Sequence, residues 1–92
     1  MKEPSPPLSA LSMMARFHFH LFNDDDVWDE EGQELPDLAA AEAEAVRAAR
    51  DVIAHHVLSG RPICLDHRME IMDDRGTVLR IVYFSQAVTF RT

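Results

Sequence analysis

The sequence predicts an α+β fold of order β-β-α-β-β, in which one long helix packs on one face of an antiparallel sheet. Three observations predict this fold. Apolar and polar residues alternate over residues 15–22, a run free of Gly and Pro covers residues 38–58, and a turn at residues 73–76 separates two segments rich in β-formers. We expect residues 15–90 to form this single domain, and residues 1–14, which hold three of the five prolines, to be a disordered N-terminal extension.

The first predicted strand begins at Ala15. Its apolar side chains, which we expect to face the core, are Phe17, Phe19 and Leu21, and they alternate with Arg16, His18 and His20. The turn-forming residues 23–26 follow, and the extended pair Val27-Trp28 indicates a hairpin into a short second strand that ends at Gly32.

The helix is predicted over about residues 37–59. Asp37 is a favourable N-cap, because its carboxylate accepts hydrogen bonds from free amides at the positive end of the helix. Ser59-Gly60 and Pro62 stop the helix. A helical period places one group of mainly apolar residues on a single side: Leu38, Ala45, Ala49, Val52, Ile53 and His56.

A second hairpin is predicted around Asp73-Asp74-Arg75-Gly76. A type I turn with Gly76 in the left-handed conformation places Asp73 opposite Thr77. An uninterrupted register then pairs Ile71 with Leu79, Glu70 with Arg80 and Met69 with Ile81.

One helix covers only one face of such a sheet. The other face is expected to carry His18, His20, Phe22, Glu70, Met72, Val78, Arg80, Val82 and Phe84. This surface is too apolar to be left to water, so we expect a second copy, giving a homodimer, or another protein to cover it.

The charge of the chain is concentrated in one segment. The 9 Lys+Arg and 16 Asp+Glu give a net charge of −7, and residues 24–37 hold eight carboxylates without a basic residue. This charge argues against direct binding of nucleic acid. An EF-hand is excluded because Trp28 and Asp29 occupy the fifth and sixth positions counted from Asp24. The segment is therefore interpreted as a solvated turn with capping residues that can meet a basic partner.

The candidate interaction residues come from the acidic segment and from the neighbouring strand. They are Asp24, Asp25, Asp26, Trp28, Glu30 and Glu31, with His18, His20 and Phe22. His18 and His20 project from one face of a strand, a spacing that can chelate zinc or nickel with His67 as a third ligand. The simpler interpretation is a histidine pair at an interface, where protonation near neutral pH tunes association.

Other features limit the classes of function. The three glycines are explained by turns and caps rather than by a phosphate-binding loop, and we expect no cofactor and no catalytic residue. The single cysteine and the absence of a long apolar run favour a bacterial-type cytoplasmic protein with no membrane segment.

Several of these motifs occur together in one known family. The strand Met14-Ala15-Arg16-Phe17-His18-Phe19-His20, the segment Asp29-Glu30-Glu31-Gly32-Gln33-Glu34-Leu35-Pro36-Asp37-Leu38 and the ending Val82-Tyr83-Phe84-Ser85-Gln86-Ala87-Val88 resemble the small alphaproteobacterial proteins grouped as domain of unknown function 6894. The resemblance spans residues 14–88 and implies a fold, but it brings no catalytic residue. Met14 lies where members of that family begin.

Three functions are compatible with these patterns. The leading hypothesis is a non-enzymatic interaction or regulatory module that self-associates through its sheet and offers residues 24–37 to a basic partner. A regulator resembling HicB antitoxins is the first alternative, based on the hairpin that leads through Pro36-Asp37-Leu38 into an Ala/Glu-rich helix. A small metal-dependent enzyme that uses His18, His20 and His67 is the second.

Overall fold

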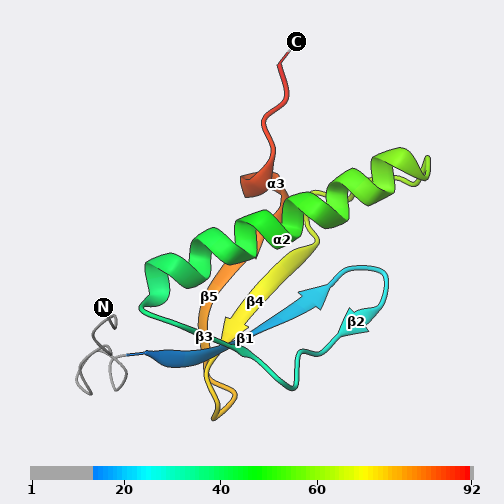
Figure 1. Cartoon of the computed structure of the whole chain (residues 1–92). Helices are drawn as coiled ribbons and strands as arrows, with labels where there is room; N and C mark the ends of the chain where they lie inside the picture. Colours follow the sequence, from blue (N-terminus) through cyan, green and yellow to red (C-terminus); the bar gives the residue numbers. More distant parts are fainter. Residues whose placement is uncertain (1–13, 92) are drawn as a thin grey trace, which may run out of the picture.

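One long helix, α2 (Leu38–Leu58), lies across one face of a five-stranded antiparallel sheet (Figure 1). The structure is a computed structural model, and it describes residues 14–91. The remaining elements are β1 (Ala15–Phe22), β2 (Asp26–Val27), β3 (Gln33–Leu35), β4 (Arg68–Met72), β5 (Val78–Tyr83) and the short helix α3 (Phe84–Ala87). The predicted α+β class is confirmed. The predicted disorder of the N-terminal extension falls on residues 1–13, outside the described part, and on Met14, which has no regular structure.

The sheet has the order β2-β1-β4-β5, and β3 also pairs with β1. β2 pairs with β1 at Leu21 and Phe22, whereas β3 pairs with β1 at residues 15–17. The middle of β1 therefore has no strand partner on this edge among the described residues. β3 was not predicted, because three residues with one apolar side chain give too short a pattern for a strand.

α2 begins and ends as its sequence predicts. The Asp37 carboxylate accepts the N–H of Ala40 at 2.8 Å, and the N–H of Ser59 donates to the carbonyl oxygen of His55 at 3.0 Å. The residues that α2 buries are Ala41, Ala45, Ala49, Ile53 and His56. Three alanines in this stripe let the helix lie close to the sheet. No helix among residues 14–91 is long and apolar enough to cross a membrane.

The predicted register of the second hairpin is correct at the turn and wrong beyond it. The N–H of Asp73 donates to the carbonyl oxygen of Thr77, Gly76 has φ +81°, and Met72 pairs with Val78. The next pair joins Ile71 to Arg80, so Leu79 is a β-bulge. Glu70 therefore pairs with Ile81 and Met69 with Val82, one residue away from the prediction.

The bulge changes which residues of β5 face α2. Val82 and Phe84, predicted on the uncovered face, are buried in the core under α2 with exposures of 5% and 0%. Arg80 also turns to this side and donates from Nε to Glu42 of α2 at 2.7 Å, so it forms no pair with Glu70. Ile81 and Tyr83 take their places on the other face of the sheet, because they pair with residues of β4 that point there.

Candidate binding site on the open sheet face

The face of the sheet away from α2, called the open face below, is a lattice of nine side chains in three cross-strand rows. Strand pairing sets His18, Met72 and Val78 in the first row, His20, Glu70 and Ile81 in the second, and Phe22, Arg68 and Tyr83 in the third. Arg68 lies over the ring of Phe22 at 4.7 Å and donates to Glu70 at 2.6 Å. The loop between β2 and β3 covers only the β1 side of the lattice, where its Trp28 lies against His20 and Phe22. The lattice therefore has a covered half on β1 and an uncovered half on β5.

Asp29 fastens that loop to the unpaired middle of β1. Its carboxylate accepts the N–H of Phe19 at 3.1 Å and the N–H of Gly32 at 3.1 Å. Its own N–H donates to Nδ1 of His20 at 2.9 Å, and its carbonyl oxygen lies 2.9 Å from Nδ1 of His18. One residue thereby takes the place of a missing strand and fixes both imidazole rings.

His18 is held as an imidazolium. Nδ1 meets the carbonyl oxygen of Asp29, and Nε2 meets Oδ1 of Asp74 at 2.7 Å. Both oxygens only accept, so both ring nitrogens donate. The hydrogen bond to Asp74, and next the one to Asp29, raise the pKa of His18 above its ordinary value.

His20 is held neutral beside this cation. The N–H of Asp29 occupies the lone pair of Nδ1, which leaves the proton on Nε2. Burial, with the His18 charge as a weaker contribution, lowers the pKa of His20, while the Asp29 and Glu70 carboxylates oppose this shift. The two rings stack with centroids 6.2 Å apart. Their environments thus separate two neighbouring histidines into one charged and one neutral group.

We expect NMR titration to give midpoints on opposite sides of the ordinary pKa of about 6.5, above it for His18 and below it for His20. The His18 contacts stabilise the fold fully below pH 6.5 and are lost as the pH rises through the raised pKa. Neutral His20 has the opposite dependence, and its contribution is lost as the pH falls from 6.5 through its lowered pKa.

Asp74→Asn should move the midpoint of His18 down toward 6.5, because it replaces the carboxylate that accepts from the ring with a neutral amide. Asp66→Asn, a change of an exposed residue outside this cluster, serves as the control. Equal midpoints for the two histidines would contradict the assignment.

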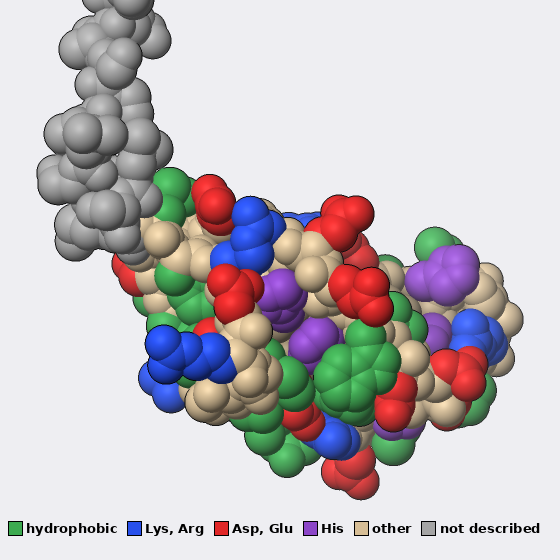
Figure 2. Space-filling view, turned by 90° about the horizontal axis from the view of Figure 1, so that it is seen from below, with side chains coloured by type: hydrophobic (Ala, Val, Ile, Leu, Met, Phe, Trp, Pro, Cys, Tyr) green, Lys and Arg blue, Asp and Glu red, His purple; other side chains and the backbone are tan. Residues whose placement is uncertain are grey.

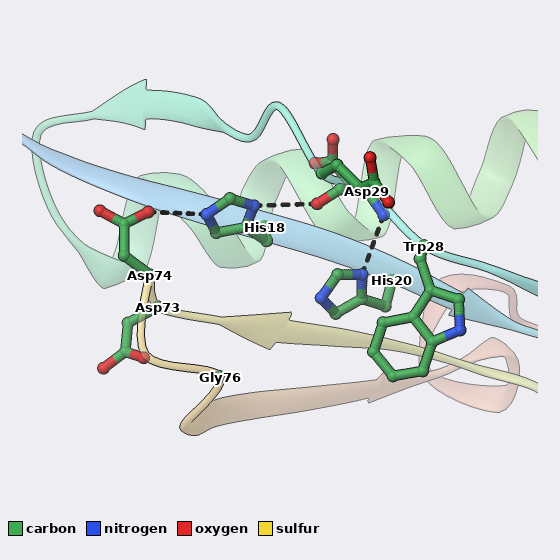
Figure 3. Close-up of a pocket in the computed structure, with 8 residues that line it drawn as sticks. His18, His20, Trp28, Asp29, Asp73, Asp74 and Gly76 are labelled. Atoms are coloured by element: carbon green, nitrogen blue, oxygen red, sulfur yellow. Dashed lines mark hydrogen bonds and ion pairs between the residues drawn. The ribbon is translucent and has the colours of Figure 1, made fainter.

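A pocket of about 350 Å³ opens beside the histidine pair. It is lined by residues from three segments, namely His18, His20, Trp28, Asp29, Glu30, Asp73, Asp74 and Gly76 (Figure 3). Figure 2 shows histidine side chains in a hollow of the surface, with acidic side chains and a large hydrophobic one around them. Trp28 lies against His20 at 4.6 Å and Phe22 at 5.5 Å between ring centroids, and it is 57% exposed.

Within residues 14–91, no loop covers the β5 side of the open face in this way. Val78, Ile81 and Tyr83, one from each row, are 43%, 39% and 42% exposed. β5 is also the last strand of the sheet. A half-exposed apolar stripe therefore runs along an open edge.

The structure separates the three predicted metal ligands. His67 precedes β4 and its ring packs against Phe84 at 5.7 Å, whereas His18 pairs with Met72 at the other end of that strand. Both nitrogens of His18 donate, and Nδ1 of His20 accepts an N–H, so the pair offers a metal no free lone pair. Among the described residues no three His, Cys, Asp or Glu side chains are placed to hold a metal ion.

The predicted interaction residues divide into three groups. Trp28 and Glu30 join His18 and His20 at the pocket. Phe22 belongs to the open face beside Trp28. Asp24, Asp25, Asp26 and Glu31 are exposed and lie outside the pocket, and Asp24 lies 3.8 Å from both Arg61 and His67.

Four residues that line the pocket were missed by sequence reasoning, namely Asp29, Asp73, Asp74 and Gly76. Asp29 was counted only as one acid among eight, although an Asp followed three residues later by Gly is a typical loop motif. Asp74 was assigned to a turn, and no sequence pattern connects a residue 56 positions away with His18.

The fold and the site together define a class, a small α+β domain with one helix on an antiparallel sheet and an acidic, histidine-containing pocket on the open face. The family described as Domain of unknown function (DUF6894) matches residues 16–85, and the chain belongs to this family. No curated protein and no solved structure matches this chain.

Proposed function

We propose that this protein is a non-enzymatic interaction module that self-associates through its sheet, with β5 as the contact strand. The observation that carries the proposal is the apolar stripe of Val78, Ile81 and Tyr83 beside the open edge of β5. An edge strand presents unpaired N–H and C=O groups, and an adjoining apolar stripe adds a hydrophobic gain when a further strand pairs there.

A second copy of the chain is the partner that fits this edge. Antiparallel pairing about a two-fold axis joins β5 to itself, so one strand supplies both sides of the contact. Val78, Ile81 and Tyr83 are uncharged on the open face, and Arg80, the only charged residue of β5, is engaged by Glu42 on the other face. No like charges then oppose each other across the open-face stripe. A domain of this size also leaves much of its surface unburied, which favours association.

We expect Ile81→Lys to convert a dimer into a monomer, because it places a charge in the middle of the stripe. Light scattering after size exclusion measures the mass. Val57→Lys, a change of an aliphatic residue 60% exposed on α2, is the matched control and should stay dimeric. A single-chain mass for the unmodified protein at high concentration, or a dimer that survives Ile81→Lys, would refute the proposal.

The proposal locates this module in the cytoplasm, since Cys64 is a free, exposed thiol.

The antitoxin-like alternative has gained no support beyond the order of elements, and element order alone does not define a function. The metal-dependent enzyme loses its basis with the separation of His67 from the histidine pair.

A further inference from the structure

We propose that the pocket beside His20 and Trp28 binds one basic residue, arginine or lysine, of a peptide segment. This goes beyond self-association and uses the other half of the open face. The pocket lies between the loop of residues 28–30 and the β4–β5 turn, and its volume of about 350 Å³ suits one long side chain.

The charges around the pocket select a cation. Four carboxylates, from Asp29, Glu30, Asp73 and Asp74, line it against the single imidazolium of His18. A concave surface with this excess of negative charge raises the local concentration of cationic groups. Trp28, exposed at the rim, offers an aromatic face to an ammonium or guanidinium group and to its aliphatic stem.

Several acceptor atoms are free for that cation. Asp73 accepts the N–H groups of Arg75 and Thr77 with Oδ1 alone, and Asp74 meets His18 with Oδ1 alone. The second oxygen of each carboxylate therefore stays available among the described residues. The N–H of Thr77 holds the pKa of Asp73 below its ordinary value, which keeps this group charged. Glu30 is exposed and has no hydrogen-bond partner in the described part of the chain.

His20 supplies a hydrogen-bond donor to the pocket. The residue as a whole is 7% exposed, but its Nε2 is not buried, since Nδ1 of His67 is the one buried side-chain nitrogen or oxygen without a partner among residues 14–91. In Figure 3 this nitrogen points away from Asp29 toward the side of the pocket where the β4–β5 turn lies. Because this N–H is open to the pocket and makes no hydrogen bond to the described residues, an oxygen atom that a ligand brings can accept from it.

The two requirements together define the ligand. A basic side chain meets the carboxylates and Trp28, while a main-chain carbonyl oxygen of the same residue accepts from Nε2 of His20. A simple cation satisfies only the first requirement, and an anion is repelled by the carboxylates.

The test uses the full chain and the tripeptide acetyl-Gly-Arg-Gly-amide, followed by the fluorescence of Trp28, the only tryptophan. The citrulline tripeptide, which has the same shape without the charge, should bind about tenfold more weakly. The n-butylguanidinium ion, which lacks the carbonyl group, should also bind several-fold more weakly than the arginine tripeptide.

Two neighbouring variants localise the site. Glu30→Gln should weaken binding of the arginine tripeptide by about threefold to tenfold, whereas Glu31→Gln, the same change one residue away and outside the pocket, should leave it unchanged. Equal affinities for the arginine and citrulline tripeptides, or equal losses in the two variants, would overturn the proposal. An n-butylguanidinium ion that binds as tightly as the tripeptide would overturn the peptide assignment. The same affinities should be found with Ile81→Lys, because residue 81 lies outside the pocket. Binding by this variant thus tests the pocket independently of self-association.

Discussion

Phe84→Ala should lower the free energy of unfolding by about 3–5 kcal/mol, the usual cost of emptying the site of a buried phenylalanine. Phe84 is fully buried at the start of α3, and its N–H donates to the carbonyl oxygen of His67 at 2.8 Å. Small domains are stable by only about 5–15 kcal/mol, so the loss removes much of the total. Urea unfolding followed by circular dichroism measures it.

The matched control for this change is Phe90→Ala. Phe90 is 69% exposed, and its replacement should alter the free energy of unfolding by no more than about 0.5 kcal/mol. Similar losses in the two variants would show that Phe84 does not occupy the core. They would instead support the uninterrupted hairpin register, which places Phe84 on the open face.

Asp29→Ala should cost about 2–4 kcal/mol of unfolding free energy, because it leaves the N–H groups of Phe19 and Gly32 without their acceptor. No strand pairs with this stretch of β1 on that side, so nothing else in the described fold replaces the carboxylate. The loop that carries Trp28 then keeps only the main-chain contacts of residue 29 with His18 and His20. Urea unfolding measures the loss of stability, and the NMR midpoints of His18 and His20 report the loop.

Asp25→Ala is the control for Asp29→Ala, since Asp25 is exposed and lies in the same acidic segment. It should leave both the unfolding free energy and the two midpoints near their original values. If both variants lose the same stability, the effect arises from the charge of the segment and not from the contacts of Asp29.

Local patterns were sufficient to predict the main elements of the fold. The strand β1 with Phe17, Phe19 and Leu21 toward the core, the cap at Asp37 and the left-handed Gly76 are decided by neighbours within a few residues, and all three are confirmed. The bulge at Leu79 is different, because its consequence, the burial of Val82 and Phe84 in the core, involves segments far apart in the sequence. One extra residue reversed the faces assigned to the strand from Arg80 onward, as the period of two requires.

The site was predicted only in part for the same physical reason. Its members on one strand, His18 and His20, follow from spacing along the chain. Their protonation states depend on Asp29 and Asp74, which reach them through a loop and a distant turn. Burial and hydrogen bonding of this kind arise in the folded chain and are absent from any local pattern.

The most direct test of self-association is hydrogen–deuterium exchange of the full chain at low and at high protein concentration. Pairing of β5 with its copy predicts that amides of Val78–Tyr83 become more protected as concentration rises, while those of β2, at the opposite edge of the sheet, keep their exchange rates. Exchange in β5 that is independent of concentration, or protection that develops at β2 instead, would contradict the assignment of β5 as the contact strand.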